Sequence, residues 1–469
     1  MKQLSGLDAA FLYMETDETP MHIAGLTVVD LPKGFKGSYH NTFREMFEAR
    51  VHEVPIFGMK LAKAAFQLDH PGWVDAGEID FDYHIPTIKL PKPGTWEQVE
   101  DLVAELHAET LDRSRPLWKF TVIEGLEGGR AALYSKMHHA AVDGAAGVAI
   151  ALALFDFTPD VRKAKPVEEK EAVRKPTMPE RTILTFHDII ANLARQQLLA
   201  IESVPKALSQ LTDLITPVLS GKVGLPQMLA PKTPFNVTVS KEKTYAARTL
   251  PLADAKMVAK ATGSKLNDVV MAITAGAVRK YLMARQALPD SALMAFVPIS
   301  LREVGNTDTN NQVFGMNCAL ATNYGDPLKR LQKITEGSKA SKALSSSVKD
   351  AAPTDFTLLG APTLLPGLMQ LYGGSRLADV MPSAVNMCIS NTMGPPMQVY
   401  LAGSEVQAHF PVSIATHGVG LNVTVQSYKQ QLDFGLTAGA NAVPDMTELA
   451  DLFEGSLAEL KTAVEKQAA

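Results

Sequence analysis

Apolar residues recur at helical spacing in three stretches of the chain, and capping residues mark where two of these stretches begin. Thr95 is followed three residues later by Gln98, and apolar side chains then recur three or four positions apart, which is typical of an amphipathic helix with a capping box. This pattern predicts a helix at about residues 96–112. Residues 445–448 have the same capping-box form and predict a C-terminal helix. A third helix is predicted at residues 266–285.

Residues with a high β propensity predict a hairpin in the first half of the chain. Residues 117–123 read LWKFTVI, residues 127–129 are a turn sequence containing two glycines, and residues 130–138 form a second β-prone run. The second strand ends in a histidine, and His139 follows it directly. The predicted hairpin therefore ends at two consecutive histidines.

A charged segment separates the two halves. Residues 160–181 contain 12 charged side chains in 22 positions, interrupted by prolines, which is typical of a solvated linker. Residues 182–220 then carry an apolar stripe at helical spacing, which suits either a crossover helix packed on the core or a surface that docks on lipid. The second half again mixes strands and helices, with β-prone runs at 293–299 and 385–436. We expect three parts, at residues 1–159, 160–243 and 244–469.

Composition restricts the class of protein. The chain has 469 residues, of which 46% are hydrophobic and 20% are charged, which is the composition of a folded globular chain rather than a fibrous or disordered one. Forty-five basic side chains against 50 acidic ones give a net charge of −5. Because that sign opposes broad electrostatic binding of a polyanion, we expect no nucleic-acid partner.

The cysteines and the lengths of the apolar runs indicate in which cellular compartment the protein is expected. Cys318 and Cys388 are the two cysteines and form no CxxC pair, so neither a disulfide framework nor a cysteine zinc site is expected. Acidic residues among the first 18 positions interrupt the apolar run that a signal peptide needs. The longest clean apolar run, residues 145–155, is 11 residues, short of the roughly 20 that span a bilayer. We expect a cytoplasmic protein whose membrane contact is at most peripheral.

The strongest chemical signal is the heptad HHAAVDG at residues 138–144. A histidine at a strand end suits a general base, because an imidazole with a pKa of about 6.5 is mostly neutral at pH 7. Since adjacent strand residues point to opposite faces, only one of His138 and His139 should face a cavity. The alternatives are a hydrogen-bonded core histidine, and a metal site using His138, His139 and Asp143. Neighbouring strand histidines diverge, however, and no further His or Cys cluster completes a ligand set.

Other catalytic patterns are absent from the sequence. No GxSxG nucleophile elbow, Walker A loop or GxGxxG loop occurs. These absences favour direct, base-assisted group transfer without a phosphate-binding loop.

Six further blocks are spread along the chain: LSGLDAAF (4–11), PLW (116–118), LNDVV (266–270), PISLR (298–302), NQVFG (311–315) and SNTMGP (390–395). The heptad and these blocks together resemble the bacterial wax ester synthase/acyl-CoA:diacylglycerol acyltransferases, within the CoA-dependent acyltransferase superfamily. HHxxxD by itself is shared with chloramphenicol acetyltransferase and with condensation domains, so the later blocks carry the narrower resemblance. Asn310 stands where a glycine is usual in the family, and Thr392-Met393 replaces a usual Val-Pro.

This resemblance implies an α/β fold of the chloramphenicol-acetyltransferase-like type, with two similar mixed-sheet halves that meet at a central tunnel. It implies that His139 is the general base and His138 its neighbour in the catalytic motif. Asp143 is expected to be structural and to pair with an arginine, for which Arg302 is the candidate; the alternative is that Arg302 is only a surface charge. Asn267 is expected either to donate to the oxyanion or orient the acceptor, or only to start a helix.

Three more residues are candidate substrate contacts. Gly144 closes the heptad, and Trp118 lies in the PLW block, although a strand tryptophan also packs readily in a core. Gly360 lies in the apolar segment 356–369, whose composition suits an acyl-chain channel, a membrane-facing surface or ordinary core. A glycine there leaves volume for an alkyl chain, although a backbone conformation that requires glycine is the alternative.

The resemblance predicts an O-acyltransferase that moves a long-chain acyl group from acyl-CoA to a fatty alcohol, giving wax ester, or to diacylglycerol, giving triacylglycerol. No cofactor and no metal are expected beyond acyl-CoA as co-substrate. The expected location is the cytoplasm, with a peripheral position on the inner membrane face or on lipid bodies as a further option. The alternatives are a superfamily acyltransferase with another alcohol acceptor, and a non-catalytic lipid-binding or lipid-body protein.

Overall fold

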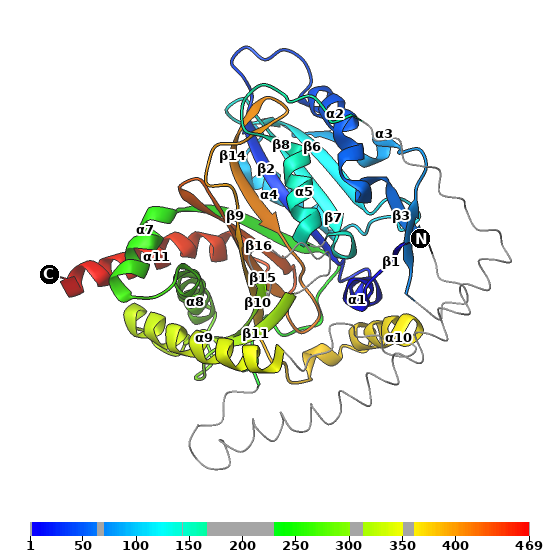
Figure 1. Ribbon diagram of the computed structural model, residues 1–469. Helices are drawn as coiled ribbons and strands as arrows, with labels where there is room; N and C mark the ends of the chain where they lie inside the picture. The colour runs from blue at the N-terminus through cyan, green and yellow to red at the C-terminus, as the bar shows by residue number, and fades with distance from the viewer. Residues whose placement is uncertain are drawn as a thin grey trace.

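Two mixed β-sheets with flanking helices dominate the computed structural model of the protein (Figure 1). The structure describes residues 2–62, 70–142, 144–166, 229–300, 313–349 and 361–468. In the described residues, one sheet has seven strands, the other has six, and a small third sheet has three. The predicted α/β class with two mixed-sheet halves is confirmed.

The seven-stranded sheet contains the predicted hairpin. Its strand order is β5-β6-β7-β2-β14-β13-β8, and the hairpin strands β6 and β7 turn through Gly128 and Gly129, whose φ angles are 77° and 71°, a conformation that favours glycine. Strand β14 pairs antiparallel with β2, so the C-terminal part of the chain adds strands to this N-terminal sheet. Its strands are β2 (His22–Asp30), β5 (Thr87–Lys89), β6 (Trp118–Leu126), β7 (Arg130–His138), β8 (Phe155–Asp156), β13 (Tyr400–Leu401) and β14 (Ser404–Val412).

The six-stranded sheet belongs to the second half and has the order β11-β10-β12-β15-β16-β9. Its centre is parallel, because β12 pairs parallel with both β10 and β15, and its edges are antiparallel. The predicted strand at 293–299 is β10, and the predicted sheet stretch at 385–436 contains β12 to β16. The strands are β9 (Lys243–Pro251), β10 (Met294–Ser300), β11 (Val313–Ala319), β12 (Met387–Met393), β15 (Leu421–Tyr428) and β16 (Gln431–Gly439), and the small sheet contains β1 (Lys2–Gln3), β3 (Met59–Ala62) and β4 (Gly72–Asp75).

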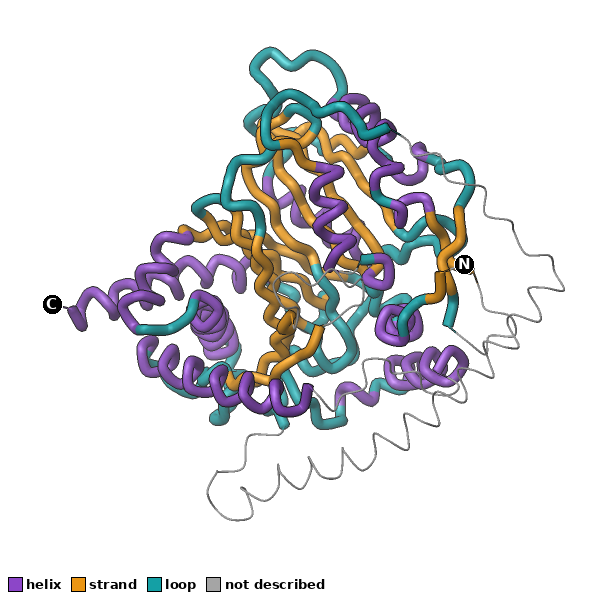
Figure 2. The backbone as a smooth tube through the Cα atoms, in the orientation of Figure 1, coloured by secondary structure: helices purple, strands orange, loops and turns teal. Residues whose placement is uncertain are grey.

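Helices flank both sheets (Figure 2), and the two sheets also contact each other directly through β14, β15 and β16. Helix α8 is buried on nearly all sides and packs with α7, α9 and α11 on one face of the six-stranded sheet. Helix α4 packs against β9 and β2, so it lies between the two sheets. The helices are α1 (Gly6–Met14), α2 (Tyr39–Arg50), α3 (Phe81–His84), α4 (Trp96–Ala108), α5 (Gly144–Leu154), α7 (Leu252–Thr262), α8 (Leu266–Ala284), α9 (Pro327–Lys349), α10 (Ala361–Gly374) and α11 (Met446–Ala468).

Helix α4 begins as predicted, with the Thr95 side chain and Gln98 forming the capping box, but it ends at Ala108 rather than at 112. The chain becomes extended at Glu109, and the buried ammonium of Lys136 donates to the carbonyl oxygens of Leu106 and Glu109. These hydrogen bonds satisfy carbonyls at the end of the helix that would otherwise need a further turn. The predicted helices at 266–285 and at the C-terminus are α8 and α11.

Several sequence predictions fall outside the described residues. These are the linker beyond residue 166 and the apolar stretch 182–220, together with Asp143, Arg302 and Gly360. Among the helices that the structure does describe, none combines the length and the apolar composition needed to cross a bilayer.

Candidate active site

Helix α1 brings two side chains against the histidine pair. Ser5 caps this helix by accepting a hydrogen bond from the N–H of Asp8 at 3.1 Å, as serine commonly does at a helix start. Phe11 lies on the helix, and Glu15 directly follows its last residue. The LSGLDAAF block is therefore the start of an element that contacts the HHxxxDG motif.

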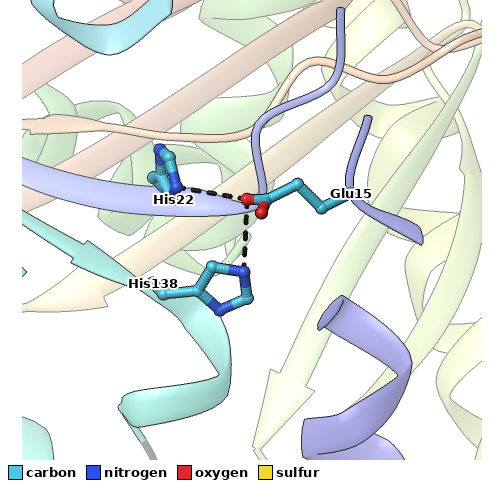
Figure 3. Close-up of side chains that lie close together, drawn as sticks. All are labelled: Glu15, His22 and His138. Atoms are coloured by element: carbon cyan, nitrogen blue, oxygen red, sulfur yellow. Dashed lines mark ion pairs between the residues drawn. The ribbon is translucent and has the colours of Figure 1, made fainter. Parts of the chain in front are cut away.

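His138 ends strand β7 and is fully buried. Its Nδ1 accepts a hydrogen bond from the N–H of Ala140 at 3.0 Å, so in the neutral ring the proton is on Nε2. That Nε2 lies 3.2 Å from the Oε2 atom of Glu15 (Figure 3). The carboxylate therefore holds His138 in one orientation and one tautomer.

Glu15 also contacts His22 on the neighbouring strand. His22 lies opposite His138 in the β2–β7 register, and its Nε2 is 3.1 Å from the same Oε2 atom (Figure 3). Arg113 donates to the other oxygen of Glu15 from Nε and Nη2, at 3.1 and 2.7 Å. Burial raises the pKa of Glu15, but its contacts with His138 and His22 lower it more, so the carboxyl group is ionised at neutral pH.

Glu15, His22 and His138 could be taken for a metal site, because their candidate ligand atoms lie within 4.8 Å of one another. The hydrogen bonds argue against that interpretation. Because His138 accepts a hydrogen bond at Nδ1, a metal on Nε2 would require this imidazole to lose both protons. The N–H of Leu111 points to His22 Nε2 at 3.3 Å, and the Arg113 cation already neutralises Glu15. We interpret the cluster as a hydrogen-bonded support for the motif.

His139 follows β7 in a short 3-10 turn, residues 139–141. Its imidazole stacks on Phe11, with 3.9 Å between ring centres and 11° between ring planes. Its N–H donates to the carbonyl of Met21 at 2.8 Å, which anchors the turn to the start of β2. Burial lowers the pKa of His139 to about 4, partly opposed by its own carbonyl group. The ring is therefore neutral at pH 7 and able to accept a proton.

Asn267 occupies the first turn of α8 and is half-buried. The Nδ2 of Asn391 donates to its Oδ1 at 3.4 Å, so the LNDVV and SNTMGP blocks meet in space. The adjacent Asp268 supports the helix start, because its Oδ2 accepts from the N–H of Lys265 and its Oδ1 from Ser338. Asp268 rather than Asn267 therefore caps the helix. In the described residues, the side-chain contact of Asn267 uses its oxygen, so its N–H groups can donate to another molecule.

Trp118 lies in the core rather than at an open surface. Its side chain is 1% exposed, packs among Phe47, Phe57 and Phe120, and donates from Nε1 to the carbonyl of Phe57 at 3.0 Å. His84 stacks on it at 4.2 Å. This position supports the packing interpretation over a substrate contact, because no face of the indole is left open.

Gly144, Cys318 and Cys388 also lie in the described part of the chain. Gly144, the last residue of the heptad, is the first residue of α5. Cys318 is buried and Cys388 is half-buried, and burial raises the pKa of each thiol to about 12. Neither thiol is therefore a nucleophile at neutral pH.

Sequence reasoning missed Glu15, His22 and Arg113, and it gave Phe11 no separate role. A signal was present for Phe11 in the LSGLDAAF block. Glu15 and His22 carry no spacing pattern that links them to the heptad, because their contacts depend on strand register and on how α1 packs.

Comparisons with known proteins match most of the chain to two models of one family. Residues 4–270 match the wax ester synthase/diacylglycerol acyltransferase catalytic domain, and residues 309–461 match the C-terminal domain of the same family. A putative diacylglycerol O-acyltransferase of Mycobacterium tuberculosis is 34% identical over 466 residues, which is 98% of this chain and 100% of that protein.

Solved structures show the same fold. The wax ester synthase/diacylglycerol acyltransferase from Marinobacter aquaeolei VT8 is similar with a TM-score of 0.71 at 27% identity, covering 99% of this chain and 100% of that one. The starter condensation domain of rhizomide synthetase shares the fold at 12% identity, with a TM-score of 0.56 over 99% of this chain and 94% of that one. This chain belongs to the wax ester synthase/diacylglycerol acyltransferase family.

Proposed function

We propose that this protein is an acyl-CoA-dependent O-acyltransferase that transfers a long-chain acyl group to a fatty alcohol or to diacylglycerol, with His139 as the general base. Family membership over nearly the whole chain supports the acyl transfer. The observation that carries the assignment of the base is the state of His139, whose neutral imidazole is stacked on Phe11 at the end of β7.

The proposed reaction is one direct transfer. The imidazole of His139 takes the proton of the acceptor hydroxyl while the oxygen attacks the thioester carbonyl. The resulting tetrahedral oxyanion collapses, the C–S bond breaks, and the CoA thiolate leaves. A thiolate binds protons more tightly than an imidazole whose pKa is about 4, so the imidazolium returns the proton to sulfur and regenerates the base. No separate strong acid is needed.

Three further residues have proposed roles. An N–H of Asn267 stabilises the oxyanion or orients the acceptor, which is consistent with the engagement of its oxygen by Asn391. Asp143 pairs with Arg302 and supports the loop that follows the histidines. His138 does not contact substrate in this scheme, because its ring is enclosed and held by Glu15.

We also propose that the protein docks peripherally on a lipid surface through α10 and the turn that follows it. Leu368, Leu371 and Val380 are 57, 60 and 77% exposed, and Leu377 and Met381 add to the same apolar area. Exposed apolar area of this kind suits an enzyme whose acceptor dissolves in lipid. Leu371→Asp/Val380→Asp should reduce co-sedimentation with dioleoylglycerol-containing phosphatidylcholine vesicles, whereas Val148→Asp/Leu152→Asp on α5 should not.

The activity is tested by incubating the purified protein with palmitoyl-CoA and either hexadecanol or dioleoylglycerol. Thiol release and lipid products are followed together. Stoichiometric release of CoA and formation of wax ester or triacylglycerol support the proposal. Binding of lipid without thiol release would instead identify a non-catalytic lipid-binding protein, and thiol release that needs neither acceptor would identify a thioesterase.

A further inference from the structure

A cavity of about 690 Å³ lies between the end of α1 and helix α10, which are neighbours in the fold (Figure 1). Its volume is within the range of small-molecule sites. Exposed side chains, among them Asp17 and Glu18, form its rim, whereas buried ones form its inner wall. The inner wall includes Leu12, Tyr13 and His417, and Met369 and Gln370 line the α10 side.

The inner wall of this cavity lies next to the groups that hold the histidine pair. Glu15 lines the cavity, and its carboxylate is 3.2 Å from the ring of His138. Leu12 also lines the cavity, and the residue before it, Phe11, stacks on His139. Neither histidine of the pair is among the described lining residues, so a molecule that enters between α1 and α10 first meets the segment that holds the histidines.

The charges at the rim oppose one of the two substrates. Asp17 and Glu18 are exposed carboxylates, and Arg113 forms an ion pair with Glu15 that neutralises its positive charge. Burial lowers the pKa of His417, so this ring is neutral at pH 7. Among the described lining residues, the rim therefore carries net negative charge, which disfavours the several phosphate charges of CoA and leaves a neutral alcohol unaffected.

Two further features suit a lipid with a hydroxyl group. Leu368 and Leu371 are exposed on the outer side of α10, next to the residues of that helix that line the cavity, so an apolar chain finds apolar surface at the rim. Inside, His417 is 6% exposed and its Nδ1 accepts from the N–H of Val239 at 3.2 Å. Its Nε2 therefore carries the proton, and this donor has no hydrogen-bond partner in the described parts of the chain.

We propose that the cavity between α1 and α10 is where the hydroxyl-bearing lipid acceptor enters and binds, and that acyl-CoA reaches the histidine pair by a different route. This inference rests on the proposed acyltransferase function. It assigns the acceptor to a defined part of the fold and gives Asp17 and Glu18 the task of excluding CoA there.

Filling the cavity tests the assignment. Gln370→Trp places a bulky side chain in it, and Gln332→Trp, the same change at an exposed position of α9 outside the lining, is the matched control. With decanol as a dissolved acceptor, Gln370→Trp should raise the KM for decanol at least threefold and leave the KM for palmitoyl-CoA within twofold. Gln332→Trp should change neither. A raised KM for palmitoyl-CoA, or no change in either constant, overturns the proposal.

A second experiment uses exposed residues and so avoids the risk that a bulky residue disturbs folding. In the double variant Asp17→Lys/Glu18→Lys, free CoA should compete with decanol more strongly than in the parent protein. The inhibition constant of CoA should fall at least threefold. Glu454→Lys/Glu465→Lys makes the same charge change on α11 and should leave inhibition as in the parent. Equal inhibition constants in both variants overturn the role of the rim. If the parent protein itself releases no thiol with any acceptor, the proposed function fails instead.

Discussion

The ring of Phe11 lies parallel to the imidazole of His139, with 3.9 Å between their centres. Four residues later, Glu15 contacts His138. The N-terminal segment thus holds both histidines of the HHxxxDG motif, one through a ring face and the other through a carboxylate. This contact joins residues more than 120 positions apart and predicts that the N-terminal helix is part of the catalytic apparatus.

Phe11→Ala should lower kcat about tenfold, because it removes the ring that fixes the imidazole and admits water to its face. Hydration should also move the pKa of His139 toward its ordinary value of about 6.5. Phe11→Tyr, which keeps a ring, should retain most activity. Steady-state rates and the acid limb of the pH profile check both effects, and an unchanged pH profile in Phe11→Ala would show that Phe11 does not shield His139.

His139→Ala should remove nearly all transfer activity, by roughly 10²- to 10⁴-fold, which is typical for the loss of a general base. His138→Ala should affect stability more than chemistry, because it leaves the buried N–H of Ala140 without its acceptor and removes one contact of Glu15, at a cost of about 1–3 kcal/mol. Thiol-release assays on protein shown to be folded by circular dichroism separate the two. Equal losses in two folded variants would contradict the assignment of His139.

Glu15→Gln should lower the free energy of unfolding by about 1–3 kcal/mol, because the neutral amide no longer balances the Arg113 cation and presents one oxygen where the carboxylate presented two. Asp17→Asn removes a nearby but exposed carboxylate and should change stability by less than about 0.5 kcal/mol. Urea unfolding of the two variants makes the comparison. Similar midpoints for both would mean that the cluster does not stabilise the fold.

The pH dependence of kcat/KM should show an acid limb near pH 4. Burial lowers the pKa of His139 to about 4, so the active, neutral form persists as the pH falls from 7 to 5 and is lost only near and below 4. An exposed histidine would lose activity through pH 6.5. Rates are measured only where circular dichroism shows folded protein, and a midpoint between 6 and 7 would contradict the desolvated state of this ring.

The sequence alone was sufficient to locate the hairpin, the starts of α4 and α11, and the catalytic heptad. These features are local: strand alternation, capping residues and turn glycines act over a few positions, so they are visible in a single chain. Alternation also predicted that His138 and His139 lie in different surroundings. It did not decide which one is enclosed by the core, since that depends on what packs against each face of β7.

Tertiary structure alone decided the partners of the histidines. His22 faces His138 because of the register between β2 and β7, and Glu15 reaches both because α1 packs against the turn after β7. The burial of Trp118 and the pairing of β14 with β2 likewise depend on contacts between distant segments. Propensity and periodicity describe a segment and its immediate neighbours, whereas these contacts are selected by the packing of the whole core, so no local pattern in the chain specifies them.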